Sequence, residues 1–183
     1  MRENSPSQVD GDSQIEETEP TDGGPGGEIV SEERVVIRRA PDGGIDIPVS
    51  LRWGDVDLNN HVNNVVIARI FEESRIRALA TWFRNDSGLR RPVTVVARQD
   101  IEFRAPLMYS FAPVRVVVSV GRIGGKSVTI GCRLYSADGE LCAIARTVLV
   151  GIERSTGASL PLSDEVKAIF GNWRGPMPDL QSI

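Results

Sequence analysis

A single helix-length pattern, at residues 62–83, is the feature that most restricts the fold of this chain. Its apolar residues repeat at helical spacing and gather on one broad face, while its charged residues gather on another. The segments after it alternate apolar and polar side chains with the two-residue period of strands. One long helix and several strands bury their apolar faces most simply as two layers. The order therefore predicts an α+β fold with a mostly antiparallel sheet.

The expected strands share this alternation and end at turn residues; they cover 34–39, 45–53, 100–104, 114–120, 126–135 and 141–152. Pro48 places the second of them at a sheet edge or a bulge, because proline cannot donate to a strand ladder. A short helix is expected at residues 163–170.

The pair Asp138-Gly139 is a strong signal for a two-residue hairpin turn. Pairing around that turn places Cys132 opposite Ala145, and it also places Tyr135 opposite Cys142. The two cysteines then face opposite sides of the sheet, so we expect no disulfide between them.

Charge is distributed unevenly along the chain, whose net charge is -4. Residues 1–30 are strongly acidic and poor in apolar side chains, so they cannot offset the entropy cost of ordering. We expect a disordered acidic tail there, acting as a passive solubilising segment, then one domain at 31–172 and a C-terminal tail at 173–183.

Several classes of protein are disfavoured by the sequence. The N-terminus lacks an apolar leader, and no apolar stretch approaches the length of a membrane span. The domain carries no dense basic run of the kind that binds nucleic acid. Reduced thiols fit the cytosol, so we expect a cytoplasmic protein with no membrane span and no nucleic-acid partner.

The best candidates for catalytic residues lie in one short segment, residues 53–64, with the sequence Trp-Gly-Asp-Val-Asp-Leu-Asn-Asn-His-Val-Asn-Asn. They include two carboxylates, the only histidine and four amides, at the point where a strand pattern gives way to the helix pattern. A helix start presents free N–H groups and a positive dipole end, which suit a developing oxyanion. Part of the set has a structural explanation, because Asn and Asp commonly cap helices and build turns. Asp55 is better explained as a turn or capping residue than as a catalytic one. For His61 two interpretations stay open, a catalytic histidine and a buried structural one.

The run from Arg52 to Asp57, then His61-Val62-Asn63-Asn64 and then Phe71-Glu72-Glu73-Ser74-Arg75, resembles the hotdog-fold acyl-CoA thioesterases of the 4-hydroxybenzoyl-CoA thioesterase type. The segments 103–107, 122–127 and 138–150 continue the resemblance in the right order. It implies a long central helix wrapped by an antiparallel sheet, in a homodimer or homotetramer whose active sites are shared between subunits. It also implies hydrolysis of an acyl-CoA substrate with no metal and no bound cofactor, since CoA is part of the substrate.

The same resemblance assigns roles to individual residues. Asp57 matches the catalytic carboxylate, acting as nucleophile or as general base on water, and the backbone N–H near Asn64 matches the group that polarises the thioester carbonyl. His61 and Asn63 match supporting polar positions, and Glu73 is the reserve carboxylate. The candidates for binding the CoA part of the substrate are three basic residues near predicted turns and a neighbouring serine: Arg104, Arg122, Lys126 and Ser127. Their charges are explained equally well as ordinary surface charges.

Asn60 stands where the family often has glycine, and asparagine tolerates the positive φ that such a turn needs. Three rival functions stay open at this point. The domain could hydrolyse acyl-carrier-protein thioesters, hydrate or dehydrate acyl thioesters, or bind acyl-CoA without catalysis.

Overall fold

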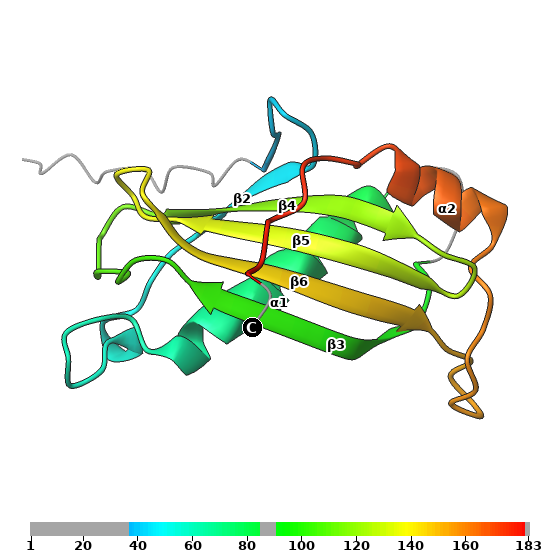
Figure 1. The fold of residues 1–183 in the computed structure, drawn as a ribbon, viewed down its shortest axis with the longest axis horizontal. Helices are drawn as coiled ribbons and strands as arrows, with labels where there is room; N and C mark the ends of the chain where they lie inside the picture. The colour runs from blue at the N-terminus through cyan, green and yellow to red at the C-terminus, as the bar shows by residue number, and fades with distance from the viewer. Residues whose placement is uncertain (1–36, 85–90, 182–183) are drawn as a thin grey trace, which may run out of the picture. The chain divides into compact units, whose positions relative to one another are not determined.

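The computed structural model describes residues 37–84 and 91–181 (Figure 1). The predicted tail at 1–30 and the start of the first expected strand lie outside these residues. The elements in chain order are β1 (Arg38–Arg39), β2 (Ile45–Val49), η1 (Trp53–Asp55), α1 (Asn64–Trp82), β3 (Thr94–Phe103), β4 (Val114–Ile123), β5 (Ser127–Tyr135), β6 (Leu141–Gly151) and α2 (Asp164–Gly171).

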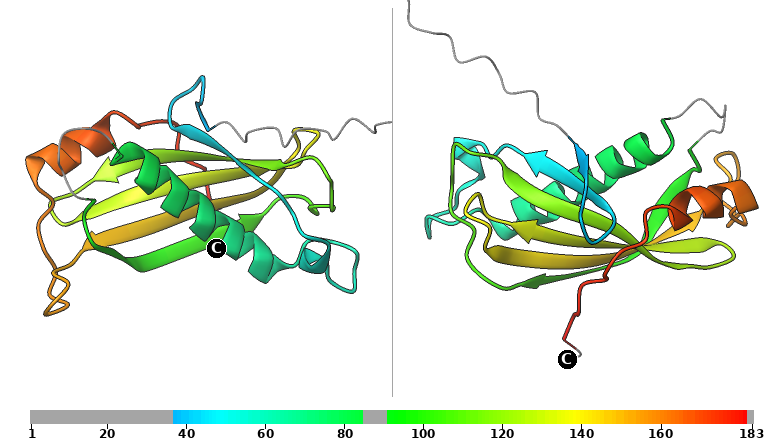
Figure 2. Two further views of the ribbon diagram at one scale, coloured as in Figure 1. Left: turned by 180° about the vertical axis from the view of Figure 1, so that it is seen from behind. Right: turned by 90° about the horizontal axis from the view of Figure 1, so that it is seen from above.

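The strands form one sheet in the order β1-β2-β4-β5-β6-β3, and every strand ladder in it is antiparallel. The long helix α1 crosses one face of the sheet obliquely (Figure 2), packing most closely on β2, β4 and β5. The strand β3 forms one border and pairs, within the described residues, with β6 alone. The predicted α+β architecture, a long helix on an antiparallel sheet, is confirmed.

The main core lies between α1 and the sheet, where the apolar face of the helix is buried. Phe71 is fully buried there, and Ile70, Ala78 and Leu79 lie on the same face at helical spacing. The sheet contributes alternating residues of its central strands: Val116, Val118, Val120, Ile130, Cys132, Leu134, Ala143 and Ala145. Within the described residues, no helix is both long and apolar enough to cross a membrane.

The hairpin between β5 and β6 has the predicted register over most of its length, with Cys132 opposite Ala145. The predicted pairing of Tyr135 with Cys142 is wrong. A bulge between Leu134 and Tyr135 shifts the ladder, so that Tyr135 pairs with Leu141. Both cysteines are free and buried, in agreement with the expectation of no disulfide. Burial raises the pKa of the Cys132 thiol to about 12, so that this thiol stays protonated.

Several predicted boundaries need correction, and the largest change is in the strand expected at 100–104, which is β3 and begins six residues earlier, at Thr94. The strand expected at 45–53 stops at Val49, and Trp53 begins a short 3-10 turn whose Asp55 carboxylate accepts the Arg52 N–H. The helix expected at 62–83 begins at Asn64, and the short helix expected at 163–170 is α2, capped by Ser163. Pro48 is not one of the two β2 residues that pair with β1. The hydrogen bond that a proline cannot donate is therefore not missing from the β1–β2 ladder.

The C-terminal segment, residues 173–181, was expected to be a tail, and it packs across the outer face of the sheet (Figure 1). A Cβ on Gly121 would meet Met177, and one on Gly131 would meet Met177 and Pro178, so both glycines permit this close approach. Trp173 stacks on Trp82. The segment therefore covers the outer surface of β4 and β5.

Candidate active site

The loop between β2 and α1 is held in place by the buried carboxylate of Asp55. Its Oδ2 accepts the Arg52 N–H at 2.8 Å, and its Oδ1 pairs with the Arg69 guanidinium at 3.0 Å. The backbone carbonyl of Asp55 also accepts the Asn63 N–H. These bonds fix the loop to α1, so Asp55 has the turn-forming role expected for it.

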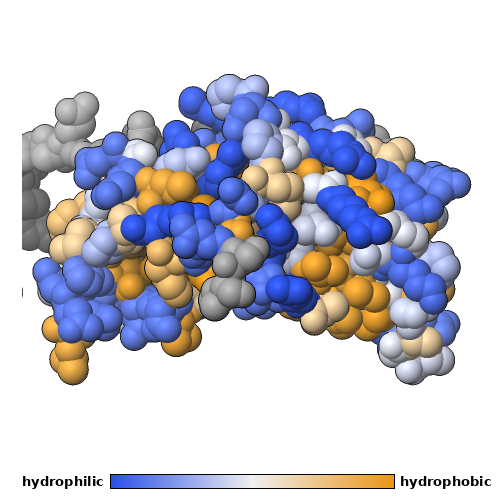
Figure 3. Space-filling model, in the orientation of Figure 1, coloured by the Kyte–Doolittle hydropathy of each residue, from blue (hydrophilic) through white to orange (hydrophobic). Residues whose placement is uncertain are grey.

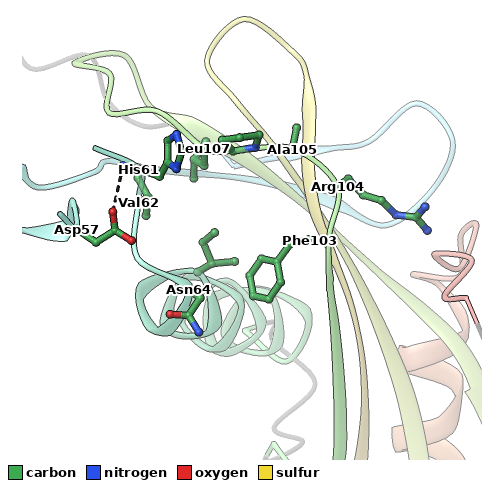
Figure 4. Close-up of a pocket in the computed structure, with 10 residues that line it drawn as sticks. Asp57, His61, Val62, Asn64, Phe103, Arg104, Ala105 and Leu107 are labelled. Carbon is green, nitrogen blue, oxygen red and sulfur yellow. Dashed lines mark hydrogen bonds between the residues drawn. The ribbon is translucent and has the colours of Figure 1, made fainter. Parts of the chain in front are cut away.

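Asp57 lies in a tight turn that the following residues close. Its Oδ1 accepts the Asn59 N–H at 2.8 Å and, more weakly, the His61 N–H at 3.4 Å (Figure 4). Asn60 adopts a φ of 61°, the left-handed conformation that the sequence anticipated at this position. Among the described residues, no group donates a hydrogen bond to Oδ2 of Asp57. One carboxylate oxygen thus orients the side chain and the other is left for chemistry.

The start of α1 presents backbone N–H groups beside this carboxylate. Asn63 caps the helix by accepting the Val65 N–H at 2.9 Å. The N–H of Asn64, the first helical residue, makes no hydrogen bond to any described residue. A free N–H at the positive end of a helix dipole is suited to bind an oxyanion.

The capping geometry assigns Asn63 a structural role that can be measured. We expect Asn63→Ala to lower the free energy of unfolding by roughly 0.5–2 kcal/mol, because the Val65 N–H loses its acceptor. Urea denaturation checks this, with Asn63→Ser as the control that keeps a cap. An unchanged stability of Asn63→Ala together with lost activity would instead assign Asn63 a direct role in substrate binding.

Asp57, His61 and Asn64 line one cavity of about 460 Å³. Its other walls come from the loop before α1, from α1 itself and from the end of β3 with the residues after it, namely Val62, Ile67, Phe103, Arg104, Ala105, Pro106 and Leu107. Figure 4 shows Phe103 lying over the start of α1, across from Asp57. The Val62 N–H donates to the Leu107 carbonyl at 2.8 Å, which joins the two walls. Among the described residues, no three His, Cys, Asp or Glu side chains gather to hold a metal ion.

The other predicted site residues lie elsewhere. Glu73 is outside this cavity and pairs with Arg77 at 3.7 Å. Arg104 contributes to the cavity wall, but its guanidinium turns away to Glu102 and to the Asp179 carbonyl (Figure 4). The remaining CoA-binding candidates lie around the turn between β4 and β5, at the opposite end of the sheet in Figure 1: Arg122 near the end of β4, Lys126 in the turn and Ser127 at the start of β5.

Sequence reasoning missed that Phe103 and Leu107 form an apolar wall of this cavity together with Ile67. The helical spacing of Ile67 relative to Asn64 and the position of Phe103 at a strand end were the available signals. Sequence reasoning also chose Glu73, and not Glu72, as the reserve catalytic carboxylate. The structure places Glu72 on the side of α1 that faces the start of β3.

A family model described as the thioesterase-like superfamily matches residues 51–170, which include the loop, α1 and the four long strands. The chain belongs to the thioesterase-like superfamily. It is a thioester hydrolase with the hotdog fold, as the resemblance implied.

Thioesterases of known structure share this architecture. A predicted thioesterase from Bacillus stearothermophilus is 25% identical with a TM-score of 0.64, covering 73% of this chain and 98% of its own. A thioesterase from Thermus thermophilus, complexed with coenzyme A and Zn, is 27% identical with a TM-score of 0.59, covering 68% of this chain and 95% of its own. The uncharacterized protein YsmA of Bacillus subtilis (strain 168) is 28% identical over 122 residues, which are 65% of this chain and 80% of YsmA.

Proposed function

We propose that this thioesterase hydrolyses acyl-CoA, releasing the free acid and CoA. The observation that carries the proposal is the placement of a carboxylate and an unpaired helix-start N–H in one cavity. Oδ2 of Asp57 and the N–H of Asn64 are both without a hydrogen-bond partner among the described residues, and both residues line the same space. The CoA bound to the related Thermus thermophilus thioesterase supports the choice of CoA as the carrier.

The reaction follows from the chemistry of these groups. The thioester carbonyl oxygen accepts the Asn64 N–H, and its carbon is attacked by Asp57 itself or by a water that Asp57 deprotonates. The tetrahedral oxyanion collapses, the carbon–sulfur bond breaks, and the thiolate leaves and takes up a proton as CoA. If Asp57 attacks directly, water then hydrolyses the mixed anhydride. His61 lines the cavity and supports proton transfer.

CoA takes part as a portion of the substrate, and no metal or bound cofactor is needed for this chemistry. The two buried free thiols fit a reducing compartment, so we place the reaction in the cytoplasm.

We further propose that two copies pair through the free edge of β3. The strand has ten residues, and its apolar residues Val95 and Val96 are 44% and 47% exposed. Figure 3 shows apolar surface at the border of the sheet that β3 forms. A long, exposed apolar edge is a template for strand pairing. Sedimentation velocity tests this proposal, since Val95→Lys should shift a wild-type dimer toward monomer.

The experiment that tests the proposed activity is release of free thiol from a panel of acyl-CoAs, with the matching acyl-carrier-protein thioesters alongside. Hydrolysis of acyl-CoA at the higher kcat/KM supports the proposal. Hydrolysis of the carrier-protein thioesters alone would show that the substrate is an acyl-carrier-protein thioester and not an acyl-CoA. Binding of acyl-CoA with no thiol release from either substrate would contradict it and favour a binding module.

A further inference from the structure

A second cavity, of about 270 Å³, lies between α1 and the start of β3. Its apolar walls come from Ile76 and Leu79 of α1, from Val93 and Val96 at the start of β3, and from Leu149 of β6. The catalytic mechanism uses none of these residues. The space is therefore available to a part of the substrate that lies away from the thioester.

Arg75 of α1 also lines this cavity and is the polar group that needs an explanation. The residue is only 5% exposed, and its guanidinium donates one long hydrogen bond, of 3.5 Å, to Oγ1 of the buried Thr147. It forms no ion pair with any carboxylate in residues 37–84 and 91–181. A buried guanidinium without a counter-charge is costly, and an anion in the cavity would remove that cost.

The charges around the cavity favour an anion. Arg91 and Arg154 also line it, and both are exposed, whereas Glu72 is the one acidic residue of the lining in the part of the chain that the structure describes. A planar guanidinium binds a carboxylate through two parallel hydrogen bonds. We propose that Arg75 binds a carboxylate at the far end of the acyl group, so that the preferred substrates are CoA thioesters of dicarboxylic acids.

The inference rests on the proposed acyl-CoA hydrolysis and on the proposed pairing of β3. Antiparallel pairing of two β3 strands about a two-fold axis places Phe103 of one copy near Thr94 of the other. Phe103 lines the Asp57 cavity and Thr94 lines the Arg75 cavity, so this pairing would bring the Asp57 cavity of one copy beside the Arg75 cavity of the other. In the arrangement we propose, the thioester carbonyl lies at Asp57 of one copy and the far end of the acyl group lies at Arg75 of the other.

The kinetic test compares three sets of CoA thioesters over a series of chain lengths: dicarboxylic monothioesters, their terminal methyl esters and unsubstituted acyl-CoAs. At one or more lengths we expect kcat/KM for the carboxylate to exceed that for the methyl ester by about 10- to 100-fold. Arg75→Gln should abolish this preference and leave the methyl ester within a few-fold of wild type. Arg115→Gln, at an exposed arginine of β4 that lines neither cavity, is the matched control for the loss of one positive charge and should keep the preference.

A binding test on the wild-type protein examines the Arg75 site without requiring catalysis and without requiring that the Arg75→Gln variant folds. Calorimetry on the wild-type protein compares a free dicarboxylic acid with its uncharged diamide, and we expect the acid to bind at least about tenfold more tightly. Equal binding of the two, or a carboxylate preference unchanged in Arg75→Gln, overturns the role of Arg75. Tight binding of the diacid without hydrolysis of any thioester supports the Arg75 site and contradicts the proposed function instead.

Discussion

Replacing Asp57 by asparagine is expected to lower kcat/KM for acyl-CoA hydrolysis by at least about 10²-fold, because the amide can neither attack the thioester nor accept a proton from water. The substitution is nearly isosteric. The Asn side-chain oxygen can still accept the Asn59 and His61 N–H groups that hold this turn. The loss therefore reports on chemistry rather than on the shape of the loop, and initial rates of thiol release measure it.

Two variants control this result. Asn59→Ala keeps the backbone N–H that binds Asp57 and should retain activity, and so should Glu73→Gln, because Glu73 lies outside the cavity. Full activity in Asp57→Asn with loss in Glu73→Gln would transfer the catalytic role to the helix glutamate. Circular dichroism and sedimentation confirm that fold and assembly are unchanged in each variant.

Truncating Phe71 to alanine is expected to cause the largest loss of stability, roughly 3–5 kcal/mol in the free energy of unfolding. The side chain is fully buried between α1 and the sheet, so its removal leaves a cavity that the surrounding strands cannot fill. A domain of this size is stable by only about 5–15 kcal/mol, so the loss is a large part of the total.

The matched control for Phe71→Ala is Val65→Ala on the same helix, where the side chain is 70% exposed. We expect it to change the free energy of unfolding by less than about 0.5 kcal/mol. Urea denaturation at one fixed protein concentration compares the two variants, because subunit association also contributes to apparent stability. Similar midpoints for both would show that α1 is not anchored through Phe71.

The sequence predicted the architecture well where hydrophobic periodicity is strong. The helix α1 is nineteen residues long, and β5 alternates buried and partly exposed residues over most of its length, so length and period indicated their types. The errors occur where periodicity is absent, as at the missed start of β3, where the neighbouring Val95 and Val96 are both exposed and a register shift follows. The bulge at Tyr135 and the early end of β2 depend on local hydrogen bonds that carry no periodic signal.

The candidate site was predictable to the extent that its parts are neighbours in sequence. Asp57, His61 and Asn64 come from one loop and the helix start that follows it, and they line one cavity. The CoA-binding candidates Arg122 and Lys126 were chosen only as basic residues near a turn, and the topology places that turn far from the loop. That Arg75 has no ion pair within the described residues depends on which residues of β6 and β3 surround it, so only the tertiary structure could reveal it.

The C-terminal segment has a consequence for the order of folding. Arg39 donates a hydrogen bond to the carbonyl of Asn172, and a Cβ on Gly43 would collide with Arg174, so the β1–β2 turn is completed by residues more than a hundred positions away. Such contacts close large loops, and their entropy cost is repaid only after the strands between them have paired. We therefore expect the β5–β6 hairpin to form early, and the two ends of the domain to lock together in the slowest kinetic phase.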